Sequence, residues 1–119
     1  MNLKATLKKL RDTYVIKQVQ RAKLPEFAPD RIRRYRFIFS GRVQKVGFRL
    51  EVCELAERLG LTGFCQNLDN GDVLAELQGA DNRIQHLVSF MGSLKRIRIK
   101  HQVVEELPID TRETAFIQR

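Results

Sequence analysis

The sequence lacks several features that would assign it to other classes of protein. No run of apolar residues approaches the roughly 18 needed to span a bilayer, and the N-terminus lacks the apolar core of a secretory signal. Two cysteines, Cys53 and Cys65, are too few for a disulfide framework and have no further Cys or His pair at zinc-site spacing. We therefore expect a cytoplasmic protein with no membrane span and no metal site. Both cysteines are interpreted as buried thiols, with a single disulfide between them as the alternative.

Histidine is equally scarce, because the chain has only His86 and His101. His86 falls beside the apolar stripe of an expected helix, His101 falls in an expected strand, and neither has a partner placed by spacing. The pattern therefore predicts no histidine-based acid–base catalysis.

The chain has the size and composition of one globular domain, with an uneven distribution of charge. It holds 119 residues, of which 43% are hydrophobic and 30% charged, and its net charge is +8. Residues 1–34 contain ten basic and three acidic residues, a net charge of +7, whereas residues 35–119 carry only +1. The excess positive charge therefore belongs to an N-terminal extension, and we divide the chain into this basic extension and a domain at 35–119.

The extension is predicted to be partly helical. From Asn2 to about Val19, apolar residues recur at spacings of three and four and form one stripe: Leu3, Leu7, Leu10 and Tyr14. Pro25 and Pro29 then favour an irregular connector. An exposed apolar stripe predicts that residues 1–20 dock on the domain or on a second copy of the chain. Nucleic-acid binding has only charge in its favour, since stacking aromatics and a recognisable RNA-binding motif are missing, and it is not predicted.

Periodicity in the rest of the chain predicts four main strands and two helices. Alternating residues from Tyr35 indicate the first strand, and a stripe from Phe48 to Leu59 indicates the first helix. Residues 61–68 and 72–79 read as a hairpin, Asp81 as the cap of a second helix ending near Gly92, and residues 97–103 as a fourth strand, with a short edge strand at 115–118. This order predicts an α+β, ferredoxin-like split βαββαβ sandwich, with two helices on one face of an antiparallel or mixed sheet.

One loop has the character of an anion site. Residues 41–49, Gly-Arg-Val-Gln-Lys-Val-Gly-Phe-Arg, join the first strand to the first helix, where backbone N–H groups and the helix dipole favour a phosphate. Arg49 adds a guanidinium that can bind two phosphate oxygens. Asn67 ends the next strand and could face the same pocket. A tight turn with a solvated arginine, and a turn-capping asparagine, are the structural alternatives.

Together these two elements resemble the acylphosphatase family from about Tyr35 to Arg119. Gly41-x-Val43-Gln44 followed by Val46-x-Phe48-Arg49 is similar to the first signature of the family. Gly63-Phe64-Cys65-Gln66-Asn67, three residues, and then Gly71-x-Val73 is similar to the second.

The resemblance implies a metal-free and cofactor-free enzyme that hydrolyses small acyl phosphates to a carboxylate and inorganic phosphate. It implies that Arg49 binds the phosphoryl group and that Asn67 positions the attacking water. The remainder of the phosphate site would be the backbone of the loop: Gln44, Lys45, Val46, Gly47 and Phe48. Phosphoryl transfer requires mainly positioning and charge stabilisation, so no strong base is needed.

The chain departs from the family at Lys45, where glycine is usual. Glycine allows a positive φ and a close approach of the backbone to a ligand. An alternative function is therefore a catalytically impaired domain that binds a phosphate, another anion or a partner without turnover. An ammonium group beside a bound phosphate is nevertheless favourable, so Lys45 could instead change substrate preference.

Overall fold

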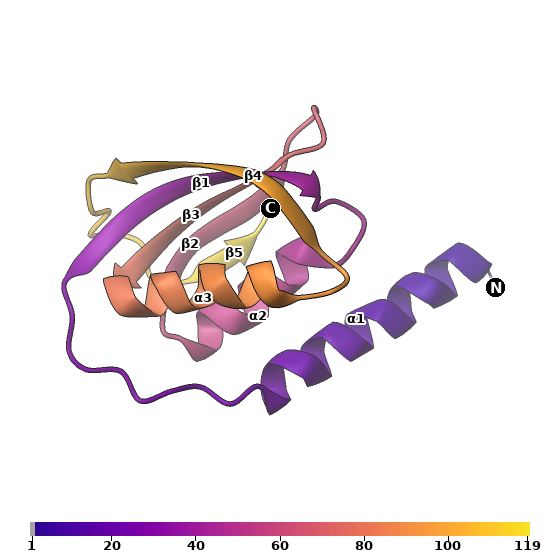
Figure 1. Cartoon of the computed structure of the whole chain (residues 1–119), viewed down its shortest axis with the longest axis horizontal. Coiled ribbons are helices and arrows are strands. Elements are labelled where there is room, and N and C mark those ends of the chain that lie inside the picture. Colours follow the sequence, from indigo (N-terminus) through magenta and orange to yellow (C-terminus); the bar gives the residue numbers. More distant parts are fainter. Residues whose placement is uncertain (1) are drawn as a thin grey trace.

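The computed structural model describes residues 2–119 and confirms the predicted architecture. The elements in chain order are α1 (Leu3–Arg21), β1 (Ile32–Arg42), α2 (Phe48–Arg58), β2 (Thr62–Asn67), β3 (Val73–Ala80), α3 (Asp81–Ser93), β4 (Arg98–Leu107) and β5 (Phe116–Gln118). After α1, the order is the predicted strand, helix, strand, strand, helix, strand, with a short edge strand added at the C-terminus (Figure 1).

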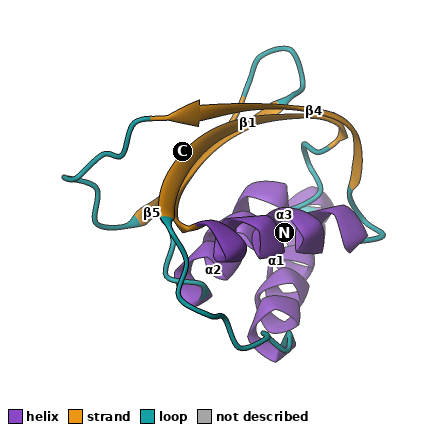
Figure 2. Ribbon diagram, turned by 60° about the vertical axis from the view of Figure 1, so that its left-hand side comes forward, coloured by secondary structure: helices purple, strands orange, loops and turns teal. Residues whose placement is uncertain are grey.

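The strands form one mixed sheet in the order β4-β1-β3-β2-β5. Strand β1 is antiparallel to both β3 and β4, β2 is antiparallel to β3, and β5 is parallel to β2. Helices α2 and α3 cover one face of the sheet (Figure 2). No helix among residues 2–119 has the length and apolar character needed to cross a membrane.

The core lies between the sheet and these two helices, as the alternation of apolar residues predicts. Phe37 and Phe39 of β1 are buried and their rings stack with centroids 5.5 Å apart. Phe39 also packs on Phe48, the first residue of α2, at 5.2 Å. The site loop between β1 and α2 is thus held at both ends by buried aromatic side chains.

The predicted cap of the second helix is wrong. Asp81 is the first residue of α3, Ala80 occupies the cap position, and no side chain of the cap residue bonds to the helix. Asp30 supplies the acceptor instead, because its Oδ2 accepts the Asn82 N–H at 2.8 Å, and Asn82 Nδ2 donates to the carbonyl of Ala28. The connector at 22–31 therefore caps α3 from a distance, which spacing along the chain does not reveal.

The leucine stripe of the extension does not pack on the domain, and its docking on a second copy of the chain stays a prediction. Leu3, Leu7, Leu10 and Tyr14 are 72%, 56%, 63% and 58% exposed, whereas Val15 and Val19 are fully buried. At about 100° per residue, these valines lie roughly a quarter-turn or more away from the stripe. Arg58 of α2 donates to the carbonyls of Val19 and Ala22, which fixes the C-terminal end of α1 on the domain.

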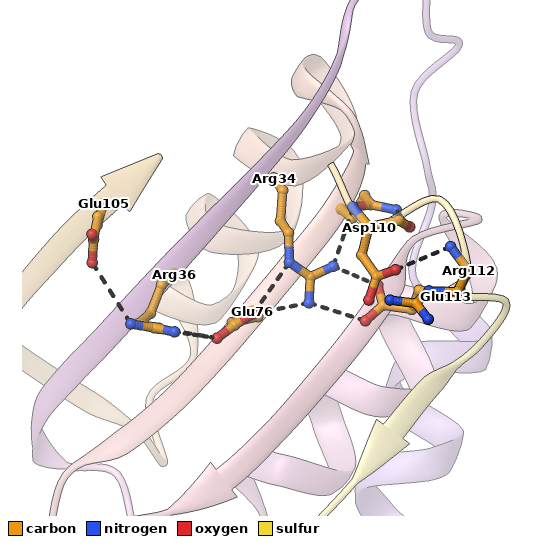
Figure 3. Close-up of polar contacts among 8 residues, drawn as sticks. Arg34, Arg36, Glu76, Glu105, Asp110, Arg112 and Glu113 are labelled. Atoms are coloured by element: carbon orange, nitrogen blue, oxygen red, sulfur yellow. Dashed lines mark hydrogen bonds and ion pairs between the residues drawn. The ribbon is translucent and has the colours of Figure 1, made fainter. Parts of the chain in front are cut away.

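An ion-pair network on the helix-free face of the sheet holds the loop between β4 and β5. Buried Arg34 donates to Glu76 at 2.9 Å and to Glu113 at 2.7 Å, and Arg36 donates to the other oxygen of Glu76 at 2.8 Å (Figure 3). Burial alone would raise the pKa of Glu76, but the hydrogen bonds from Arg36 and Arg34 hold it below its ordinary value. By fixing Glu113, the network positions β5.

Candidate active site

The loop that joins β1 to α2 has the geometry of an anion cradle. Within residues 2–119, the backbone N–H groups of Gln44, Lys45, Val46, Gly47 and Phe48 donate to no protein acceptor. These groups precede and begin α2, where the positive end of the helix dipole lies. Unpaired donors in a largely buried segment are costly unless a ligand or water accepts from them.

Two residues of the loop adopt left-handed backbone conformations. Gly47, the N-cap of α2, has a φ of 79°, and Lys45 has a φ of 63°. Among residues 2–119, Lys45 is the only non-glycine residue with a positive φ. The chain therefore keeps at Lys45 a conformation that favours glycine, at a cost of about 1–2 kcal/mol.

Side chains from other elements hold the loop in place. Gln44 Nε2 donates to the carbonyls of Leu68 and Asp72, each at 2.8 Å, and so links the loop to the β2–β3 hairpin. Arg96 Nε donates to the carbonyl of Val46 at 2.6 Å. The loop is thus preorganised before any ligand binds.

A buried ion pair lies behind the loop. Arg96 Nη2 donates to Oε1 of Glu51 at 2.5 Å, and Glu51 is fully buried in the first turn of α2. Burial raises the pKa of Glu51, and Arg96 opposes that rise. Sequence reasoning missed Arg96, because no spacing relates a residue just before β4 to a loop some 50 positions earlier.

One cavity brings the predicted catalytic residues together. Its volume is about 710 Å³, and Lys45, Gly47, Phe48, Arg49 and Asn67 all line it. Arg49, half-buried in the first turn of α2, donates from Nη1 to the main-chain oxygen of Arg119 at 2.7 Å. Asn67 is exposed at the end of β2. Gln44 and Val46, the other two residues predicted for the phosphate site, are not among the residues that line the cavity.

The remaining wall comes from the extension. Lys4, Lys8 and Arg11 of α1 line the same cavity as the loop and Asn67. The excess charge of residues 1–34 was the one sequence signal that bore on these side chains, and it did not place them at the site.

Other titratable candidates are placed elsewhere. His86 packs edge-on against Phe27 and His101 is exposed on β4, and neither lines the cavity. Both cysteines are free thiols, Cys53 half-buried and Cys65 buried. Burial raises the pKa of Cys65 to about 12, so this thiol stays protonated at neutral pH.

The fold and the cavity define a class: a split ferredoxin-like domain with a cavity at the N-terminus of the helix that follows the first strand. A family model described as Acylphosphatase matches residues 35–117. The chain therefore belongs to the acylphosphatase family, and the match begins directly after the extension.

Individual relatives agree with this assignment. The chain is 40% identical to an acylphosphatase of Clostridium perfringens over 87 residues, which cover 70% of this chain and 94% of the relative. The crystal structure of an acylphosphatase from Bacillus subtilis superposes with a TM-score of 0.68 and 29% identity, covering 75% of this chain and 99% of that one. An acylphosphatase structure from Coxiella burnetii gives 0.67 and 29%, covering 74% and 93%.

Proposed function

We propose that the protein hydrolyses acyl phosphates, with the phosphoryl group bound by Arg49 and the backbone of residues 44–48. The observation that carries the proposal is that Arg49, Asn67 and three loop residues, Lys45, Gly47 and Phe48, line one cavity. The backbone N–H groups of these loop residues donate to no protein acceptor among residues 2–119. Membership of the acylphosphatase family supports the same reaction.

In the proposed reaction, a water oxygen attacks phosphorus as the bond from phosphorus to the acyl oxygen breaks. The carboxylate leaves with the bonding electrons, and the protons of the water pass to phosphate and solvent. Asn67 would orient the water through its amide. One N–H of Arg49 donates to the main-chain oxygen of Arg119, which orients the guanidinium and leaves its other donors for the phosphoryl oxygens.

The proposed site needs neither a strong base nor a metal ion. A carboxylate is a good leaving group, and a fixed array of donors stabilises the charge that develops on the phosphoryl oxygens. The left-handed conformation of Lys45 supports an active loop over the impaired alternative, since the backbone keeps a shape that suits glycine.

The domain boundaries and the cellular location of the protein are also part of this proposal. We place the catalytic domain at residues 35–119 and the extension at 1–34, although β1 itself begins at Ile32. We also propose a cytoplasmic location.

The test is hydrolysis of benzoyl phosphate by purified protein in excess chelator. Arg49→Ala and Asn67→Ala should each lower kcat/KM by about 10²–10³. Arg42→Ala and Gln66→Ala are matched controls, because Arg42 is an exposed arginine next to the loop, Gln66 precedes Asn67 on β2, and neither lines the cavity. Full activity in the Arg49 and Asn67 variants, or loss of turnover on adding chelator, would contradict the proposal.

A further inference from the structure

The cavity is formed by two parts of the chain that differ in charge and in position. The loop, Arg49 and Asn67 form one side, and the N-terminal half of α1 forms the other. Helix α1 runs alongside α2, and its N-terminal half projects beyond it (Figure 1). Residues outside the family match therefore complete the walls of the site.

Contacts near the middle of α1 fix its position relative to the loop. A Cβ atom at Gly47 would lie only 3.1 Å from Val15 Cγ2 and 3.3 Å from Arg11 Nε, so the helix rests against the loop where Gly47 has no side chain. Gln18 Oε1 accepts a hydrogen bond at 3.2 Å from Arg96, the residue that also holds the loop carbonyl of Val46. Arg96 thus holds both the α1 wall and the loop in place.

The α1 wall carries positive charge beyond what a phosphoryl group requires. Lys4 and Lys8 lie one turn apart, are exposed, and have no acidic partner within 4.0 Å among residues 2–119. Arg11 is paired with Asp12 at 2.9 Å, and both of these residues line the cavity. Lys4 and Lys8 line the same cavity as the loop and Arg49. Because the loop donors and Arg49 suffice for a phosphoryl group, the two lysines are available to another part of a bound substrate.

We propose that Lys4 and Lys8 select acyl phosphates whose acyl part bears a second negative charge. The proposal rests on the function proposed above and adds the class of acyl group to it. The second charge would be a carboxylate or another anionic group far enough from the phosphoryl group to reach α1. Leu7 lines the same cavity and would provide apolar contact for the carbon skeleton.

The first test compares 4-carboxybenzoyl phosphate with 4-carbamoylbenzoyl phosphate, which has a similar shape and no second charge. In Lys4→Gln/Lys8→Gln, the ratio of kcat/KM for the charged over the neutral substrate should fall about fivefold, and the loss should shrink in high salt. Lys9→Gln/Lys17→Gln is the matched control, since it removes the same charge from exposed positions of α1 that do not line the cavity. An equal ratio in wild type and the Lys4/Lys8 variant, with normal turnover of both substrates, overturns the inference alone.

The second test measures binding and does not depend on turnover. The corresponding phosphonates, 4-carboxybenzoylphosphonate and 4-carbamoylbenzoylphosphonate, have a carbon–phosphorus bond that this reaction does not cleave. Calorimetry gives the ratio of Kd for the carbamoyl phosphonate over Kd for the carboxy phosphonate. This ratio should fall about fivefold in Lys4→Gln/Lys8→Gln and stay unchanged in the Lys9→Gln/Lys17→Gln control. If the wild-type protein fails to hydrolyse either acyl phosphate, the proposed function fails, and the phosphonate ratio still decides the selectivity. An unchanged ratio, or no binding of either phosphonate, overturns the inference.

Discussion

At the scale of single residues, the site loop depends on one unusual backbone conformation. Lys45 takes a φ of 63° between two segments whose positions are fixed by Gln44 and Arg96. These hydrogen bonds stabilise a conformation that lysine would otherwise avoid. The loop therefore has the shape expected with glycine at this position, and the side chain of Lys45 is added to the cavity lining.

Lys45→Gly should change kcat/KM for benzoyl phosphate by less than about threefold. Glycine removes the strain of the left-handed backbone but adds about 0.5–1 kcal/mol of conformational entropy to the unfolded state, so the free energy of unfolding should also change little. Steady-state kinetics and urea denaturation check both values. A gain in kcat/KM of tenfold or more would show that lysine impairs the site and would favour the binding-module alternative.

Arg96 is the residue whose loss should have the largest structural effect near the site. Arg96→Met leaves the buried Glu51 carboxylate unpaired and frees the Val46 carbonyl, and should lower the free energy of unfolding by about 3 kcal/mol at pH 7. Glu51 in the folded state has a pKa above its ordinary value, and without Arg96 that pKa rises further. The folded state then binds the proton more tightly than the unfolded state, so the loss should diminish as pH falls below the folded pKa.

Chemical denaturation of Arg96→Met at pH 5 and pH 7 measures this effect. Arg96→Met/Glu51→Gln is the control, because it has no buried carboxylate and should not recover at low pH. An equal loss at both pH values in Arg96→Met would contradict the assigned pairing.

At the scale of elements, the apolar stripe of helix α1 is not the face through which the helix packs. The stripe of Leu3, Leu7, Leu10 and Tyr14 is regular, yet the helix packs on α2 through Val15 and Val19. Arg58 satisfies carbonyls at the end of α1, and this polar contact helps to select the packing face.

Val19→Ala should lower the free energy of unfolding by about 2 kcal/mol, since Val19 is 1% exposed. Leu10→Ala, at a position 63% exposed, should change it by less than about 0.5 kcal/mol. Thermal or urea denaturation of both variants gives the comparison. The reverse order of effects would place the leucine stripe, and not the valines, against the domain.

The ion pairs that join Arg34 and Arg36 of β1 to Glu76 of β3 should make the free energy of unfolding sensitive to acid. The pKa of Glu76 in the folded state lies below its ordinary value of 4.5, so the unfolded state binds a proton more readily. The contribution of this carboxylate is complete above the unfolded pKa and is lost as pH falls through the folded pKa.

Glu76→Gln should therefore be less stable than wild type at pH 7 and lose less stability than wild type between pH 5 and pH 3. Urea titrations at these pH values measure the difference. Glu105→Gln is the control, because Glu105 is exposed on β4 and its Oε2 lies 3.8 Å from Arg36 Nη1. Parallel loss of stability in Glu76→Gln and wild type would show that Glu76 does not carry the acid sensitivity.

At the scale of the whole molecule, local patterns predicted the fold and the placement of Arg49 and Asn67 beside the loop. Alternation along β1 and the α2 stripe follow from burial on one face, which a sequence records directly. The cap of α3, the supports of the loop and the second wall of the cavity could not be predicted. Asp30 and Arg96 bond to segments far along the chain, and Lys8 lines a cavity with residues of other elements. No local pattern encodes such long-range arrangements.

The most direct test of the account is hydrolysis of benzoyl phosphate in ¹⁸O-labelled water, with the uncatalysed rate subtracted. Water attack at phosphorus, in the cavity formed by the loop and Arg49, predicts turnover with the label in inorganic phosphate and none in benzoate. Mass spectrometry of the two products distinguishes the outcomes. Label in benzoate, or no turnover above the uncatalysed rate, would contradict the account.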